Sequence, residues 1–385
     1  MKVLRKLCIL LLAALLLSAC QNGKPTAEQT AATDATSISE TTAEPEVSKP
    51  TEPTLPTSNE LQFSPNQEGI YNYCPTAMQL DDGSVYIYYC TNQDPYQVID
   101  YVGCRRGVRG EDGSIVWESE TVALSPDGGT WDAHHTCDPS VIAGEFTYQG
   151  QSYGYLMAYL GCTSYDNQEN KIGLAVSKTP EGPFVRVGNT PLIDFQIDPS
   201  VSVFQWGVGQ PSLVSLDKKG HVNLFYTQGD KNGTRLMVDE WELSNLDTPQ
   251  KIKTESVSKT GLFNLQNQSD FMNNADLLYD ANADRYYAIS DCHPNPTDVP
   301  DYIASHVRIN FCSAKTSIAS GFWRSLCSIA PAETGFARNH NAGFLRDAYG
   351  HLPDNGYLTA FYTVSVTGND SLWSYRIYDH HVKLP

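Results

Sequence analysis

The sequence has 385 residues, of which 44 are Asp or Glu and 26 are Lys or Arg, so its net charge is −18. So acidic a chain lacks the basic surface that phosphate recognition needs, which excludes a nucleic-acid-binding protein. Hydrophobic residues make up 41% and aromatic residues 11%, with 22 tyrosines. This composition favours strands and a carbohydrate-facing surface over a helical bundle.

The N-terminus carries the pattern of an export signal. Three basic residues among the first six precede an apolar run over residues 7–17, which is typical of a secretory signal peptide. The run is shorter than the roughly 20 residues of a membrane span. Residues 17–20, Leu-Ser-Ala-Cys, resemble the bacterial lipobox, in which the cysteine becomes the lipidated first residue. We therefore expect a signal peptide over residues 1–19 and a lipid on Cys20. An ordinary signal peptide with a chance cysteine is the alternative.

Residues 20–60 read as a linker. After Cys20 they are mainly Thr, Ser, Ala, Glu and Pro, without one aromatic residue. Such a segment buries too little apolar surface to offset its ordering entropy, so we expect it to be disordered. The domain that follows would be held by its lipid anchor alone, at the extracytoplasmic face of the cell membrane.

One pattern recurs five times between residues 61 and 385: a small or polar triplet, an apolar strand, a turn and an aromatic-rich strand. The triplets begin at Cys74, Asp138, Gln210, Asn274 and Asn341. They are 64 to 72 residues apart, about the length of four strands with their loops, which is the size of a propeller blade. No stretch of the sequence keeps apolar residues at the i, i+3, i+4, i+7 spacing of an amphipathic helix over three turns. The sequence predicts an all-β chain with one domain over residues 61–385, a five-bladed β-propeller.

The triplets also predict where a ligand binds. The innermost strand of each propeller blade begins at one face of the central channel, so the first residues of the five triplets should ring one opening. A concave opening lined by polar side chains is where a ligand site is expected.

The cysteines of the repeats allow disulfides, because exported proteins form them. Cys90 and Cys292 each end a second-strand pattern, whereas Cys104 and Cys312 each lie in the strand that follows. These positions make Cys90–Cys104 and Cys292–Cys312 the candidate pairs. Buried free thiols are the alternative.

The second repeat resembles glycoside hydrolase family 43. The similar segments are Asp-Pro-Ser-Val at 138–141, Tyr-Leu-Met-Ala-Tyr at 155–159, Ile-Gly-Leu-Ala-Val-Ser at 172–177 and Pro-Glu-Gly-Pro-Phe at 180–184. The detailed similarity covers about residues 131–184, and the repeat rhythm covers the propeller. The resemblance implies a hydrolase that cleaves arabinosyl or xylosyl linkages with inversion. A catalytically inactive glycan-binding propeller is the alternative.

Inversion requires two carboxyl groups, about 6.5–9.5 Å apart, that protonate the leaving oxygen and activate water, and a third acid usually tunes the first. The resemblance implies that these three acids start the inner strands of the first, third and fourth blades. This sequence has Cys74, Gln210 and Asn274 there, and none of them can act as the expected general acid or base.

Other carboxyl groups near the same opening are therefore the catalytic candidates. Asp138 begins the second inner strand, and Asp132 lies in the loop before it. Asp276 follows Asn274 by two residues and so shares its strand face. We predict Asp138, Asp132 and Asp276 as catalytic residues. A strand-start turn, a loop acid and a structural strand residue are the respective alternatives.

Polar and aromatic residues that flank the strand starts are expected to bind the substrate. They are Trp131, His134, His135, Trp206, Gln210, Asn274 and Asn341. Aromatic rings stack on sugar faces, although packing between blades would also explain the tryptophans. The resemblance further implies a structural Ca²⁺ on the propeller axis near a histidine of the fifth blade, which would be His340. No other cofactor is expected, the partner is carbohydrate, and the chain should act as a monomer.

Overall fold

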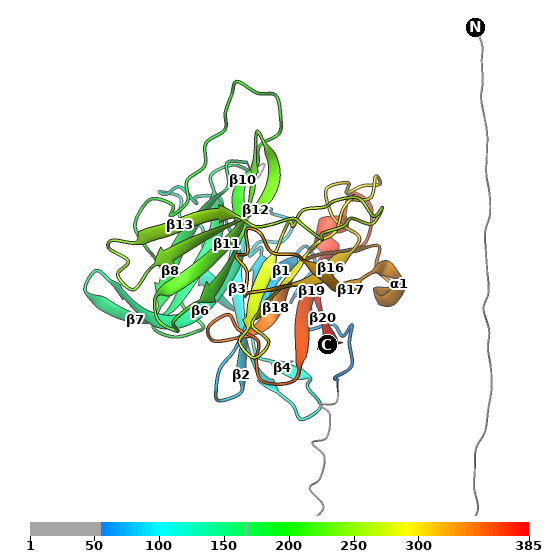
Figure 1. The fold of residues 1–385 in the computed structure, drawn as a ribbon, viewed down its shortest axis with the longest axis horizontal. Coiled ribbons are helices and arrows are strands. Elements are labelled where there is room, and N and C mark those ends of the chain that lie inside the picture. The colour runs from blue at the N-terminus through cyan, green and yellow to red at the C-terminus, as the bar shows by residue number, and fades with distance from the viewer. Residues whose placement is uncertain (1–54, 166–167, 385) are drawn as a thin grey trace, which may run out of the picture. The chain divides into compact units, whose positions relative to one another are not determined.

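The computed structural model describes residues 55–165 and 168–384, and its regular structure is almost entirely β-strand (Figure 1). The exceptions within this part are the short helix α1 (Pro331–Thr334) and the 3-10 turn η1 (Ser371–Ser374). No helix of these residues is long and apolar enough to cross a membrane. The predicted signal peptide, Cys20 and nearly all of the linker lie outside the described residues.

The strands form five antiparallel blades. Blade 1 holds β1 (Asn72–Gln79), β2 (Ser84–Thr91) and β3 (Tyr101–Arg109), with β4 (Ile115–Trp117) and β5 (Thr121–Leu124) both on the edge of β3. Blade 2 holds β6 (His135–Tyr148), β7 (Gln151–Cys162), β8 (Lys171–Ser177) and β9 (Val185–Arg186). Blade 3 holds β10 (Gly207–Ser215), β11 (His221–Asp230), β12 (Gly233–Glu242) and β13 (Gln250–Ser256).

The last two blades complete the propeller. Blade 4 holds β14 (Asp276–Asp280), β15 (Arg285–Asp291), β16 (Val307–Ser313) and β17 (Arg324–Ile329). Blade 5 holds β18 (Arg338–Asp347), β19 (Tyr357–Ser365) and β20 (Arg376–Lys383). In four blades the predicted triplet lies within the first strand, and in blade 4 it ends on the first residue of that strand. Every predicted aromatic strand falls within the second strand of its blade. The predicted fold class is confirmed.

The ring of blades is closed by pairing between the two ends of the propeller. The first strands of blades 1 and 5 run parallel, with Ala77 opposite Leu345. On the outside of blade 5, Leu61 forms a bridge with Tyr378, and the backbone N–H of Gln62 donates to Ile377. Residues 59–62 thus supply the outermost strand of blade 5, so the predicted domain start at residue 61 lies inside this pairing.

Apolar side chains pack between neighbouring blades. Between blades 2 and 3, Ile142 and Leu156 meet Leu213 and Leu224, all fully buried. The strands are nearly continuous apolar runs because each blade is covered on both faces, which is why aromatic and β-branched residues dominate them. These layers hold the blades rigid around the channel.

The predicted cysteine pairs are wrong. Cys90 lies opposite Val102 in the β2–β3 pairing, and Cys104 lies opposite Tyr88, so the two cysteines are not direct cross-strand partners. Cys90 instead forms a disulfide with Cys137, which links β2 of blade 1 to β6 of blade 2 with a Cα–Cα distance of 5.1 Å. Cys104, like Cys292 and Cys312, remains a thiol.

Candidate active site at the mouth of the channel

The first residues of the five triplets share an unusual backbone conformation. Their φ angles lie between 41° and 53°, in the left-handed region; these residues, called the upper ring, are Cys74, Asp138, Gln210, Asn274 and Asn341. In four blades the first strand shifts its register across the triplet, as between Cys137 and Ser140. Such a bulge re-aims a side chain. It turns the upper-ring residues toward the mouth, as the sequence predicts.

The third residues of the triplets form a second layer deeper in the channel, called the lower ring. It consists of Thr76, Ser140, Ser212, Asp276 and Gly343. Gly343 is required there, because a Cβ atom at this position would overlap the carbonyl oxygen of Pro75. The lower ring surrounds Arg346, whose side chain is almost fully buried.

Arg346 ties all five blades together from the channel axis. From β18 its guanidinium donates to Thr76 Oγ1 at 3.0 Å, Ser140 Oγ at 3.0 Å, Ser212 Oγ at 3.3 Å and the Leu213 carbonyl at 3.0 Å. Its Nη1 lies 3.3 Å from Asp276 Oδ1, which supplies the compensating charge. A protein cation therefore occupies the centre of the propeller.

This arrangement also explains Asp276, which the sequence presents as a catalytic candidate. Its Oδ1 accepts from Ser212 Oγ at 2.6 Å, and its Oδ2 accepts from the backbone of Phe344 at 2.8 Å. Asp276 does lie on the same strand face as Asn274, but one layer deeper, as the counter-ion of Arg346. The geometry gives it a structural role, so the alternative reading of this residue is the better one.

The residues on the axis do not fit a calcium ion. Ca²⁺ takes six to eight oxygen ligands, and the hydroxyl, carbonyl and carboxylate oxygens that face the axis already bind Arg346. His340 is buried, shares a 2.7 Å hydrogen bond with the Asn341 side chain and packs its ring 4.8 Å from that of Tyr375. Burial lowers its pKa to about 4, so the ring is neutral. No cluster of metal-ligating groups in the described residues includes His340.

Between the two rings lies a small, partly open cavity of about 20 Å³, lined by Asp138, Cys74, Gln210 and Asn274 among others. That volume suits a single water molecule and is far below the roughly 300 Å³ of a small ligand pocket.

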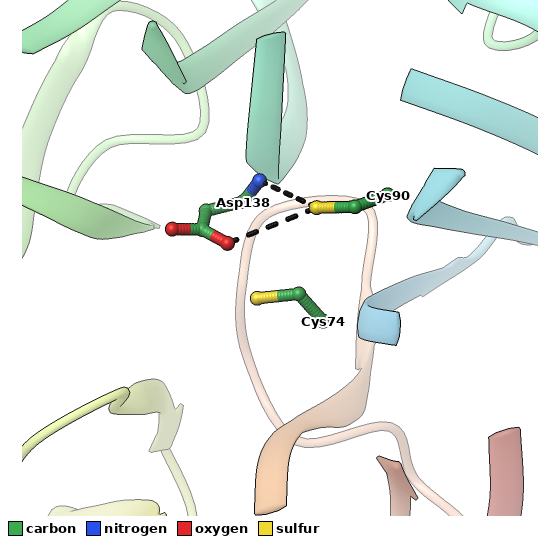
Figure 2. Close-up of side chains that lie close together, drawn as sticks. All are labelled: Cys74, Cys90 and Asp138. Atoms are coloured by element: carbon green, nitrogen blue, oxygen red, sulfur yellow. Dashed lines mark hydrogen bonds between the residues drawn. The ribbon is translucent and has the colours of Figure 1, made fainter. Parts of the chain in front are cut away.

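Asp138 is the one carboxylate of the upper ring, and its surroundings favour the protonated form. Burial raises its pKa to about 6, and the charge of Asp100 adds to the rise, whereas hydrogen bonds from Cys74 and Gln210 oppose it. Its Oδ1 lies 3.3 Å from the sulfur of Cys137 and 3.7 Å from that of Cys90. Figure 2 shows the Cys74 and Cys90 side chains converging on this carboxyl group. Asp138 is thus poised to titrate near neutral pH.

Asp291 is a second such carboxyl group, which sequence reasoning missed. It ends β15, and burial raises its pKa to about 7. Two upper-ring residues bind it: Asn274 Nδ2 donates to Oδ2 at 2.6 Å and the Asn341 backbone N–H donates to Oδ1 at 2.9 Å. The Cys74 thiol interacts with both acids. Burial is the main cause of its raised pKa, and the negative charges of Asp138 and Asp291 raise it further.

A signal for Asp291 exists in the strand register. Asp291 donates its backbone N–H to Asn273, the residue before Asn274, just as Cys90 pairs with Tyr73 before Cys74. The equivalent residues of the five second strands are Cys90, Leu160, Thr227, Asp291 and Thr363. Asp291 is the one carboxylate among them, but the register that aligns them is visible only in the structure.

His135 forms a buried pair with Asp100, another residue absent from the sequence-based candidates. His135 Nδ1 lies 2.7 Å from Asp100 Oδ2, and the Tyr71 hydroxyl donates to Asp100 Oδ1 at 2.7 Å. Nε2 of His135 is buried without a hydrogen-bond partner in the described residues. His134 stands edge-on to His135 at 4.5 Å and borders Tyr165. The charge of Asp100 in this group adds to the rise in the pKa of Asp138 that burial causes.

Asp132 and the two tryptophans lie apart from the rings. Asp132 is fully buried and its Oδ2 binds Arg186 Nε at 2.8 Å and the Tyr159 hydroxyl at 2.9 Å. Trp131 stacks on Tyr159 at 5.6 Å, and Trp206 lies against the backbone of blade 3 at Gly229. Because Asp132 is buried and already bound by Arg186 and Tyr159, its role is structural. The tryptophans are partly exposed at the mouth end, and their binding of substrate stays a prediction.

Comparisons with known proteins agree with this fold. No protein-family model and no curated protein sequence match the chain. Among solved structures, a family 117 glycoside hydrolase of the marine bacterium Zobellia galactanivorans has a TM-score of 0.53 at 12% identity, over 85% of this chain and 90% of that one. An alpha-L-arabinofuranosidase of Lactobacillus brevis has 0.53 at 11%, over 82% and 92%. A family 43 arabinoxylan arabinofuranohydrolase of Bacillus subtilis, in complex with cellotetraose, has 0.51 at 14%, over 86% and 67%. At such identities the likeness shows a shared fold, the propeller of these glycoside hydrolases.

Proposed function

We propose that this chain is a glycoside hydrolase that acts at the mouth of the propeller on oligosaccharides or polysaccharides, with Asp291 as general acid and Asp138 as general base. The observation that carries the proposal is the pair of buried carboxyl groups, with pKa values of about 6 and about 7, at the mouth. Acid–base catalysis at neutral pH needs groups that titrate in this range.

The surroundings of the two acids support this division of roles. Burial raises the pKa of Asp291 to about 7, so a large share of its carboxyl groups stays protonated near neutral pH, as a general acid needs. Asp138 has the lower pKa and faces the water-sized cavity, where an attacking water would be held. Inversion requires one carboxyl group to activate a water and another to protonate the leaving group on the opposite side of the sugar, and we assign these tasks to Asp138 and Asp291, respectively.

Aromatic side chains at the mouth support carbohydrate as the substrate class. The loops after β2, β7 and β15 open at the same end as the upper ring, because each second strand runs antiparallel to the first. They expose Tyr96, Tyr165 and Tyr302. Aromatic rings stack on the apolar faces of sugars. Arabinosyl and xylosyl linkages are the first choice, because they are the substrates that the family resemblance implies.

The test is hydrolysis of 4-nitrophenyl arabinofuranoside and xyloside, arabinan and arabinoxylan by wild type and by Asp138→Asn and Asp291→Asn. Each variant should lose at least a hundredfold in kcat/KM, since general acid–base catalysis contributes about 10²–10⁴-fold. Asp354→Asn is the control, because Asp354 is exposed in the turn before β19 at the opposite end. If either catalytic variant retains full activity on a substrate that wild type cleaves, that residue's assignment is wrong.

A glycan-binding protein without catalysis is the second candidate. It is favoured by Cys74, Gln210 and Asn274 in the upper ring, at the positions where the resemblance implies acids. Under this alternative, a glycan array would show binding that Asp138→Asn leaves intact, and no reducing sugar would appear after prolonged incubation. Release of sugar by wild type alone would exclude it.

We also propose that Cys20 carries a lipid that holds the chain at the extracytoplasmic face of the cell membrane. The lipobox-like Leu-Ser-Ala-Cys and the linker composition support this location. Cys20→Ser should move the protein from the membrane fraction to the soluble fraction, and unchanged fractionation would contradict the anchor.

A further inference from the structure

Three sulfur atoms and one carboxylate meet at the mouth. The ligand atoms of Cys74, Cys90 and Asp138 all lie within 4.8 Å of one another, and no other such group of three His, Cys, Asp or Glu residues occurs in residues 55–165 and 168–384. Cys137, bonded to Cys90, adds the third sulfur. These residues are called the sulfur cluster. We propose that, once the Cys90–Cys137 disulfide is reduced, the sulfur cluster binds one zinc ion through its three thiolates and the Asp138 carboxylate.

The distances in the cluster suit a tetrahedral site. Zn–S bonds of about 2.3 Å and Zn–O bonds of about 2.1 Å place sulfur and oxygen ligands roughly 3.5 Å apart. Asp138 Oδ1 lies 3.7 Å from Cys90 Sγ and 3.3 Å from Cys137 Sγ. In Figure 2 the Cys74 side chain lies below that of Cys90, and both sulfurs are directed toward Asp138. On reduction the two sulfurs of the disulfide must separate, and Cys137 Sγ, which lies outside the group of atoms within 4.8 Å of one another, must also move toward Cys74.

Each sulfur also faces a hydrogen-bond donor, as metal-bound thiolates commonly do. The backbone N–H of Asp138 donates to Cys90 Sγ at 3.0 Å. The Tyr73 hydroxyl lies 3.1 Å from Cys137 Sγ, and Asn341 Nδ2 lies 3.9 Å from Cys74 Sγ. The outer surroundings of a thiolate site are therefore in place before any metal arrives.

Reduction of the Cys90–Cys137 disulfide requires a two-electron reductant, and a phosphine or a dithiol supplies these electrons. Two electrons and two protons convert the Cys90–Cys137 disulfide to two thiols, and the reductant is oxidised. Zinc then displaces the protons of the three thiols, which pass to solvent, because the thiolate is the ligand form. Thiolate and carboxylate ligands together suit zinc better than the hard cations Ca²⁺ and Mg²⁺.

The experiment uses the purified chain, reduced anaerobically with tris(carboxyethyl)phosphine and titrated with Co²⁺ as a coloured substitute for zinc, then with Zn²⁺ in competition. The reduced chain should bind one metal per molecule, with a thiolate-to-cobalt charge-transfer band and visible bands of a tetrahedral site. Cys74→Ser and Asp138→Asn should each weaken binding at least tenfold. The unreduced chain should show no charge-transfer band. Cys327→Ser, on β17 of blade 4, is the matched control and should bind like wild type.

A second measurement, made on the wild type, tests the proposal even if the variants fail to fold. Zinc should protect Cys74, Cys90 and Cys137 of the reduced chain from alkylation, read by mass spectrometry, while Cys327 reacts at the same rate with and without metal. The proposal is overturned if no thiolate band appears after reduction, if folded Cys74→Ser binds as tightly as wild type, or if the unreduced chain binds equally well. Loss of the near-ultraviolet circular dichroism on reduction would overturn it too, because the fold would not hold the ligands together.

Discussion

Replacing Arg346 by methionine should be among the most destabilising single changes in the propeller. Its guanidinium donates to side chains or carbonyls of several blades and pairs with Asp276 at 3.3 Å, with 1% and 10% of the two side chains exposed. Removing one partner of a buried ion pair costs about 3–5 kcal/mol, because the other charge is left uncompensated. Methionine keeps much of the volume, so the loss reports the charge and its hydrogen bonds.

The assay is urea unfolding followed by tryptophan fluorescence, with the free energy taken by linear extrapolation. Asp276→Asn should lose a similar amount, and Arg346→Met with Asp276→Asn should lose less than the sum of the two, by about 1–3 kcal/mol of coupling. Arg106→Met is the control: Arg106 pairs with Glu118 on the surface, and such pairs contribute about 0–1 kcal/mol. If Arg346→Met costs no more than Arg106→Met, the guanidinium does not hold the blades together.

Four further predictions follow from the buried groups. The kcat/KM of wild type should be bell-shaped in pH, with apparent pKa values near 6 and 7 from Asp138 and Asp291, and Asp291→Asn should abolish the alkaline fall; a flat profile would contradict both roles. Because the folded pKa of Asp138 is raised from 3.8 to about 6, ionisation costs the native state up to about 3 kcal/mol as pH rises through this range, so Asp138→Asn should gain on wild type in urea unfolding at pH 8 relative to pH 4. Cys90→Ala with Cys137→Ala should lose about 2–4 kcal/mol, measured by urea unfolding without reductant; an unchanged midpoint would argue against the bond. Burial lowers the folded pKa of His340 from 6.5 to about 4, so stability should fall as pH drops through that interval, and a folded His340→Gln variant should not show this share of the acid loss.

The blade pattern was predictable because it depends on local chemistry repeated along the chain. A small or polar triplet before an apolar strand, followed by an aromatic strand, recurs at blade length, and each copy became the first two strands of a blade. Even the first triplet residues were predictable as a ring, since every inner strand starts at the same face. The position of Asp138 in this ring was predictable for the same reason.

The proposed partner of Asp138, Asp291, was not predictable in the same way. Asp291 ends a second strand, at the position that Cys90 and Thr363 occupy in their own blades. This equivalence depends on the register between the first and second strands, which a sequence pattern defines only to within one or two residues. The disulfide was missed for a related reason: the predicted partners of Cys90 were sought within its own blade, whereas Cys137 lies in the next one. Asp132 and Asp276 were misjudged because nothing in the chain order shows that Arg186 and Arg346 lie beside them.

Composition and period alone thus determine that this acidic, tyrosine-rich chain forms an all-β propeller with a polar mouth, because burial and strand propensity act on each repeat separately. The tertiary structure decides which charges are neutralised and which are not. Asp132 and Asp276 acquire arginine partners, whereas Asp138 and Asp291 are buried without one among the residues that the structure describes, and desolvation raises their pKa values toward neutrality. That distinction depends on side chains brought together from different blades, so only the assembled ring of blades separates structural from reactive acids.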